Sequence, residues 1–190
     1  MSFYPSLKDP AYLEDLFARF PRGVAPLIAF HDAVLRNPDS PLSIAERETI
    51  AALVSGLNAC DFCFGAHKTM AMAFGLEEAA ITALVEDIDT APVDNKLKPI
   101  LHYVRKLTLT PSKMVQADAD AVFAAGWPEE ALHDAVLVCA LFNFMNRVLD
   151  GSGITPKPVF DAPDEDSLKA RRQGSYTGWA RQAGILPSDS

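Results

Sequence analysis

The sequence predicts an all-α protein, and three observations lead to that prediction. Apolar side chains recur with the three-to-four-residue period of an amphipathic helix along most of the 190 residues. No convincing run alternates apolar and polar residues as a half-buried strand does. Residues typical of helix starts and stops divide the chain into segments of helical length. With 49% apolar and 22% charged residues, the composition suits one globular domain over residues 1–190.

The first half of the chain is expected to form five helices, of which the third and fourth have the clearest signals. Ser43 and Glu46 have the spacing of a capping box, in which each side chain accepts a backbone N–H of the other residue. Gly75 is typical of the position just after a helix. A short turn near Asn58 should fold the third and fourth helices into an antiparallel hairpin. The expected helices are 11–19, 24–35, 43–57, 60–74 and 77–85.

The second half is expected to form three helices and a C-terminal arm. The helices are predicted at 96–109, 113–125 and 128–149. The last is apolar nearly all round, which is typical of a helix at the centre of a core or in a subunit interface. Gly151-Ser152-Gly153 reads as a linker, followed by an arm over about 155–190 that contains a polar helix at 164–173. The arm has too small an apolar face to stand alone, so it should pack on the main body or on a neighbouring subunit.

An apolar helix and a polar arm of this size are more than a 190-residue monomer readily buries, so we expect a homo-oligomer. The net charge of −8 argues against binding to nucleic acid. Apolar stretches are interrupted by polar residues before they reach the length of a membrane span, so no membrane association is expected. Residues 1–9 have neither a basic nor an apolar signal region, which predicts a cytoplasmic location.

The chemically informative stretch runs from Glu48 to His67 and has the form E-x11-C-x2-C-x3-H. Cys60 and Cys63 should lie in the first turn of the fourth helix, where unpaired N–H groups and the helix dipole stabilise a thiolate. Cys63 should therefore be more ionised than an ordinary thiol. The spacing of the two cysteines also allows a disulfide with little backbone movement.

His67 and Glu48 are predicted to lie beside this cysteine pair. His67 follows Cys63 by four residues, so both project from one face of a helix, and the imidazole can take the thiol proton directly or through one water. Reflection of the hairpin about Asn58 brings Glu48 to the level of His67. A carboxylate there can orient the imidazole, as the third member of a nucleophile–base–orienter set.

This motif in an apolar helical hairpin resembles the AhpD-like alkylhydroperoxidases of the carboxymuconolactone decarboxylase superfamily, with the strongest likeness over about residues 42–84. The 142–147 segment is similar to the peroxidase-related branch. The resemblance implies a helical bundle that assembles as a trimer or hexamer and reduces peroxides with a dithiol as reductant. Well-studied members carry a histidine directly before the second cysteine, whereas this chain has Phe62.

By this resemblance Cys63 would attack the peroxide and Cys60 would resolve the resulting sulfenic acid into a disulfide, although the reverse assignment stays open. His67 and Glu48 would move the protons. We expect no metal, since zinc needs about four ligands and only Cys60, Cys63 and His67 are offered, and no cofactor.

Other interpretations of the pattern are a superfamily lyase, for which the cysteine pair is unnecessary, and a non-enzymatic redox-sensing oligomer. The remaining cysteine, Cys139, lies in the most apolar helix and is expected to be an inert core thiol. Phe62 and Phe64 either pack in the core or form the wall of an apolar mouth suited to organic peroxides. The other histidines have no partner at a suggestive spacing: His31, His102 and His133. Of these three, only His133 could approach the site.

Overall fold

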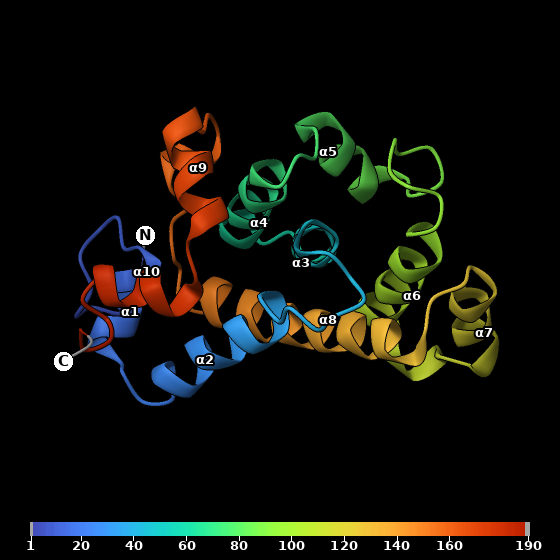
Figure 1. The fold of residues 1–190 in the computed structure, drawn as a ribbon. Helices are drawn as coiled ribbons and strands as arrows, with labels where there is room; N and C mark the ends of the chain where they lie inside the picture. The colour runs from blue at the N-terminus through green and yellow to red at the C-terminus, as the bar shows by residue number, and fades with distance from the viewer. Residues whose placement is uncertain (1, 189–190) are drawn as a thin grey trace.

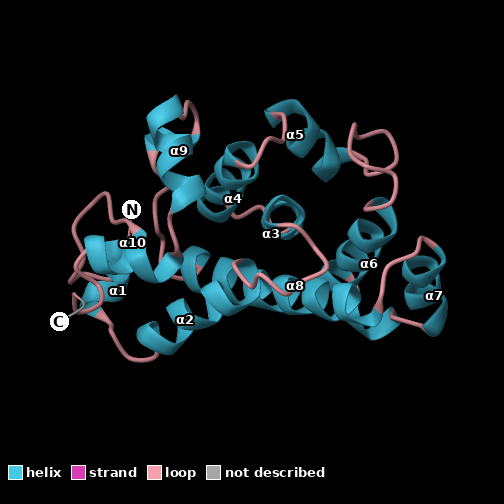
Figure 2. Cartoon of the chain, viewed as in Figure 1, coloured by secondary structure: helices cyan, strands magenta, loops and turns pink. Residues whose placement is uncertain are grey.

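The computed structural model describes residues 2–188 and confirms the all-α prediction, because this part of the chain contains helices and no strand (Figures 1 and 2). Ten α-helices are present in residues 2–188, one more than the sequence predicts, together with two short 3-10 turns. The helices are α1 (Leu13–Arg19), α2 (Val24–Leu35), α3 (Ile44–Leu57), α4 (Asp61–Ala73), α5 (Glu78–Glu86), α6 (Lys98–Leu109), α7 (Gln116–Ala124), α8 (Glu129–Asp150), α9 (Glu165–Gln173) and α10 (Tyr176–Gln182). The 3-10 turns are Pro111–Lys113 and Pro158–Phe160.

The predicted antiparallel hairpin of α3 and α4 is confirmed and forms the centre of the molecule. Ser43 and Glu46 form the capping box that begins α3. Ala59 adopts a left-handed conformation, with φ 54°, and this reverses the chain between the two helices. Figure 1 shows α3 end-on, surrounded by α4, α5, α6 and α8. Residues 47–55 of α3 are all buried, so even the charged side chains of this segment are held away from water.

The long helix α8 packs against α2, α3 and α6 and supplies much of the core. One face of α8 is fully buried, whereas Phe144 on another face is 52% exposed. In residues 2–188, α8 is the one helix with the length and apolar character of a membrane span, which differs from the sequence-based expectation. Its packing against three other helices accounts for that apolar character as part of the protein core.

The C-terminal arm returns to the main body, where α9 packs on α4 and α10 packs on α2 (Figure 1). Gly65 of α4 permits this close approach, because a Cβ there would lie 2.9 Å from the Cβ of Phe160 in the arm. The beginning of the chain is tied to the same region, since the Thr155 amide donates to the Ala11 carbonyl at 3.0 Å. The arm therefore covers the face of α4 that carries the sequence motif.

Candidate active site

Cys60 and Cys63 lie where α4 begins and both are buried free thiols. Cys60 is the residue that precedes the first turn of α4, and Cys63 is 3% exposed. The neighbouring Cys60 thiol and burial raise the pKa of Cys63 well above its ordinary value. This corrects the expectation that the helix N-terminus makes Cys63 unusually ionised, because the contact with the Cys60 thiol and the burial of the sulfur outweigh the helix dipole. The resting form of Cys63 is therefore the thiol.

The structure brings His67 against Glu48, at the level where reflection of the hairpin places them. Nδ1 of His67 lies 2.7 Å from Oε2 of Glu48, and both side chains are buried. Because an ionised carboxylate only accepts, Nδ1 carries the proton and Nε2 is left as the acceptor of the neutral ring. In residues 2–188, no direct hydrogen bond joins His67 to Cys63, so a proton passing between them requires an intervening water.

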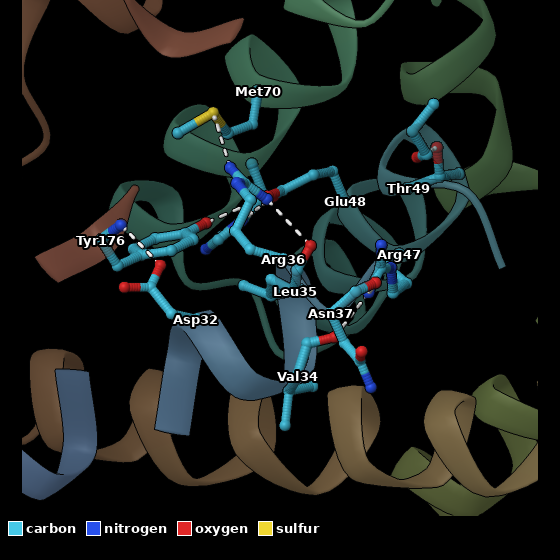
Figure 3. A network of polar contacts seen from close by, with 12 residues as sticks. Asp32, Val34, Leu35, Arg36, Asn37, Arg47, Glu48, Thr49, Met70 and Tyr176 are labelled. Atoms are coloured by element: carbon cyan, nitrogen blue, oxygen red, sulfur yellow. Dashed lines mark hydrogen bonds and ion pairs between the residues drawn. The ribbon is translucent and has the colours of Figure 1, made fainter. Parts of the chain in front are cut away.

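Two further side chains hold Glu48, and the sequence motif contains neither of them (Figure 3). Nη1 of Arg36, at the end of α2, donates to Oε1 of Glu48 at 2.5 Å. The hydroxyl of Tyr176, from α10, donates to the same oxygen at 3.1 Å. Desolvation acts to raise the pKa of Glu48, but the contacts with His67 and Arg36 outweigh it and the pKa is lowered. Glu48 is therefore an ionised carboxylate in the interior of the protein.

Tyr176 is placed by a link between the arm and α2. The carboxylate of Asp32 accepts the backbone N–H of Tyr176 at 2.7 Å and that of Thr177 at 2.9 Å. The Arg36 guanidinium also stacks over the Tyr176 ring, 4.9 Å from its centroid. Burial raises the pKa of Tyr176 well above its ordinary value, so its hydroxyl stays protonated and can donate to Glu48. The C-terminal arm thus contributes directly to the motif.

Cys63 and His67 open into one cavity of about 690 Å³ between α4, α8 and the arm. Much of its wall is apolar, formed by side chains that include Phe62, Phe142, Met145, Leu149 and Phe160. The Phe62 and Phe160 rings meet edge to face, with centroids 5.4 Å apart. A cavity of this size and lining suits an organic molecule, with a thiol and an imidazole among the groups that line it.

Polar residues of α8 complete the surroundings of the cysteines. The Asn146 amide donates to the Ser55 hydroxyl at 3.1 Å and accepts from the Asn58 amide at 2.8 Å. Asn146 also opposes the rise in the pKa of Cys63, through a polar contact with the sulfur. Cys139, in contrast, is buried against the Thr108 hydroxyl at 3.3 Å and does not line the cavity.

The other residues considered from the sequence lie in different places. His31 lines the cavity, and burial lowers its pKa to about 4, so its ring is neutral. His102 is at the surface beside Asp89, and His133 is exposed and away from the cavity. Phe64 packs against the small cluster of Ala52, Ala71 and Ile81 instead of lining the cavity. Within residues 2–188, no three His, Cys, Asp or Glu side chains are grouped to hold a metal ion.

Comparisons with known proteins agree with the resemblance. Residues 21–96 match the carboxymuconolactone decarboxylase family, and this segment contains Arg36, Glu48, Cys60, Cys63 and His67. No curated protein matches the chain.

Solved structures share the fold over most of the chain. A peroxidase-related protein from Silicibacter sp. TM1040 superposes with a TM-score of 0.73 at 24% identity, over 79% of this chain and 78% of its own. An AhpD-core peroxidase-related protein from Ralstonia eutropha JMP134 gives 0.72 at 23% identity, over 76% of each chain. The debrominase Bmp8, in complex with 2,3,4-tribromopyrrole, gives 0.68 at 13% identity, over 83% of this chain and 81% of its own. At these identities the comparisons establish the AhpD-like fold.

Proposed function

Since residues 21–96 belong to the carboxymuconolactone decarboxylase family, on an AhpD-like fold, we propose that this protein is a thiol peroxidase that reduces organic hydroperoxides through Cys60 and Cys63. One observation carries the proposal: the Cys63 thiol and the carboxylate-bound imidazole of His67 line one cavity, and a second buried thiol, Cys60, lies beside Cys63 at the start of the same helix. Such a pair can be oxidised and reduced in a cycle without a cofactor.

The first step needs a base, because Cys63 rests as a thiol. Nε2 of His67 accepts the thiol proton through one water in the cavity, and Glu48 stabilises the imidazolium that forms. The thiolate then attacks the terminal oxygen of the hydroperoxide. The S–O bond forms as the O–O bond breaks, and the departing alkoxide takes a proton from His67 through the same route. The products are an alcohol and a sulfenic acid on Cys63.

The second step returns the site to its starting state. The Cys60 sulfur attacks the Cys63 sulfur, and water leaves as the disulfide forms. A dithiol from a partner then exchanges with this disulfide, restoring both thiols and becoming a disulfide itself. The partner thus supplies the two electrons that the peroxide has consumed. Phe62, in the place of the extra histidine of well-studied relatives, leaves His67 as the base on this helix, so we expect slower turnover than in those relatives.

One equivalent of cumene hydroperoxide, followed by intact and peptide mass spectrometry, tests the proposal. We expect a loss of two hydrogen atoms that maps to Cys60–Cys63, and repeated turnover when dihydrolipoamide is added. Cys63→Ser should abolish peroxide consumption, and Cys60→Ser should stop at a sulfenic acid after one round. Cys139→Ser is the matched control, since this buried thiol lies outside the cavity and should be dispensable. Loss of activity in Cys60→Ser but not in Cys63→Ser would reverse the two roles.

The same experiment separates the alternatives. Oxidation to the disulfide without turnover by any dithiol would instead favour a redox sensor. A protein that never forms the disulfide, with peroxide untouched, would contradict the peroxidase and return attention to lyase chemistry.

A further inference from the structure

Arg171 places a positive charge on the wall of the cavity above Cys63 and His67. It belongs to α9, and its guanidinium lies 5.5 Å from the centroid of the Phe160 ring. Its Nε is buried and has no hydrogen-bond partner among residues 2–188. No carboxylate in that part of the chain forms an ion pair with Arg171, although most buried cations in proteins have one. Arg171 is therefore a partly desolvated cation with no carboxylate at ion-pair distance among residues 2–188.

The other two charged side chains that line the cavity, Lys157 and Glu14, neutralise each other. Lys157 is paired with Glu14 at 2.7 Å. Arg36 is paired with Glu48 beneath His67. His31 donates from Nδ1 to the Leu27 carbonyl at 2.8 Å and is neutral at physiological pH. The Asp, Glu, Lys and Arg side chains that line the cavity therefore keep one net positive charge, at Arg171, and Glu48 attracts this charge from outside the lining.

The position of Arg171 relative to the Cys63 thiol suggests a role in substrate binding. Arg171 comes from the arm, whereas Cys63 and His67 come from α4, so charge and thiol lie on different walls of the same cavity. Apolar side chains such as Phe142 and Met145 line the cavity as well. A guanidinium binds a carboxylate through two parallel hydrogen bonds, and one cation balances a monoanion better than a phosphate dianion.

We propose that Arg171 is the binding site for the carboxylate of the substrate, so that the protein acts on organic hydroperoxides that carry a carboxylate at the end of an apolar body. This inference rests on the proposed peroxidase function. The carboxylate takes no part in the electron transfer: it anchors the molecule at the arm while its hydroperoxide group reaches Cys63. The oxidation of Cys63 and the release of an alcohol proceed by the same steps as for any other organic hydroperoxide.

Arg172 supplies a matched control one residue away. It is exposed and donates to Glu165 at 2.7 Å, and it does not line the cavity. Arg171→Gln and Arg172→Gln remove the same charge from the same helix, but only the first removes it from the cavity. The substrates are a C18 fatty acid hydroperoxide, its methyl ester, and hydrogen peroxide.

We expect Arg171→Gln to lower kcat/KM for the acid by about 10- to 100-fold, the usual cost of losing a hydrogen bond to a charged group. The ester and hydrogen peroxide should lose much less activity than the acid, and Arg172→Gln should change none of the three. Wild-type protein should prefer the acid to its ester, and Arg171→Lys should keep part of that preference. Equal rates for acid and ester in wild type, with no selective loss in Arg171→Gln, would overturn the carboxylate site.

A binding measurement keeps this test separate from the peroxidase activity. Decanoate carries the carboxylate and an apolar chain but no peroxide, and Trp179 lies on the cavity wall as a fluorescent reporter. Decanoate should change the fluorescence of wild type and Arg172→Gln, with at least tenfold weaker binding to Arg171→Gln. If decanoate binds in this way but no hydroperoxide is consumed, the proposed function fails and the carboxylate site stands. If peroxides are reduced but Arg171→Gln binds decanoate as wild type does, the carboxylate site is wrong.

Discussion

At the scale of single residues, the site depends on how the two oxygens of Glu48 are shared. Oε2 faces His67, whereas Oε1 accepts from both Arg36 and Tyr176. Arg36 neutralises the carboxylate, so Glu48 can be buried without a net charge and still bind a protonated imidazole. An ion pair of this kind is costly to desolvate, and removal of one partner leaves the other charge buried and unpaired. Glu48 therefore contributes both to the chemistry and to the integrity of the core.

Glu48→Gln should separate these two contributions. His67→Ala removes the base and should slow peroxide reduction by roughly 10²–10⁴-fold, whereas Glu48→Gln leaves the base in place and should cost less. The same substitution leaves Arg36 buried without its counter-ion, so the free energy of unfolding should fall by about 3 kcal/mol. Glu46→Gln in the same helix is the control, because glutamine preserves the capping box. Urea unfolding of both variants measures the difference, and equal stabilities would show that the Arg36–Glu48 pair is dispensable.

His31 predicts how stability changes in mild acid. Burial lowers its pKa to about 4 in the folded protein, from 6.5 when exposed. Below pH 6.5 His31 binds a proton in the unfolded chain but stays neutral in the folded chain. The free energy of unfolding therefore decreases as pH falls from about 6.5 to 4. The contribution amounts to about 3 kcal/mol over that range. His31→Gln should flatten the curve there, whereas His133→Gln, at an exposed site, should leave it unchanged.

Glu48 affects the free energy of unfolding in a lower pH range. Its pKa is depressed in the folded state, so its contribution is complete above the unfolded value of about 4.5 and is lost as pH falls further. A slope between pH 6.5 and about 5 that persists in His31→Gln would therefore not come from Glu48, and would contradict the assignment to His31.

At the scale of elements, local sequence signals were sufficient to predict the hairpin of α3 and α4. The capping box at Ser43, the helix end before Gly75 and the mirror relation of Glu48 and His67 about the turn are all local. These signals place the acid, the base and the thiols together because a short turn between two antiparallel helices fixes which residues lie at the same level. The family resemblance drew on the same stretch.

Elements that depend on distant contacts were missed. No helix is predicted after residue 173, whereas the structure has α10, a helix of seven residues that contains Gly178. Its first turn is held by Asp32, which lies 144 residues earlier, and no local pattern reports such a contact. Arg36 and Tyr176 were missed for the same reason, since each reaches Glu48 from another helix. The pKa of Cys63 was predicted in the wrong direction because burial around the sulfur depends on the whole fold.

The link between α10 and α2 gives a prediction at this scale. Asp32→Asn removes the charge that accepts two backbone N–H groups of α10, which should weaken the link by about 1–3 kcal/mol. Amide hydrogen exchange over 176–182 should become faster, and kcat should fall as Tyr176 leaves Glu48. Tyr176→Phe is the comparison, because it removes the hydroxyl but keeps both backbone contacts. If the amide hydrogens of residues 176–182 exchange as slowly in Asp32→Asn as in Tyr176→Phe, the arm is held by its apolar contacts instead.

At the scale of the whole molecule, α8 has two faces with different roles. Ala135, Val138, Phe142 and Met145 are buried and connect the core to the cavity. A second stripe of α8, at three- or four-residue spacing, contains Leu137, Ala140 and Phe144, and it becomes more exposed along the helix. On the neighbouring helix α2, Phe30 is 42% exposed. We expect the subunits of the predicted homo-oligomer to meet at the exposed apolar stripe of α8.

Phe144→Glu tests whether this surface joins subunits. Light scattering on the wild type should return a multiple of 20.6 kDa, because an exposed apolar stripe is buried more favourably against a second copy than left in water. The glutamate would have to enter that interface unpaired, so the variant should dissociate at concentrations where wild type stays assembled. Leu109→Glu, at a 50% exposed apolar residue of α6, is the control and should keep the wild-type mass. Phe144 does not line the cavity, so the dissociated variant should still form the Cys60–Cys63 disulfide with peroxide. A wild-type mass of 20.6 kDa at every concentration would show that the stripe on α8 is simply solvent-exposed.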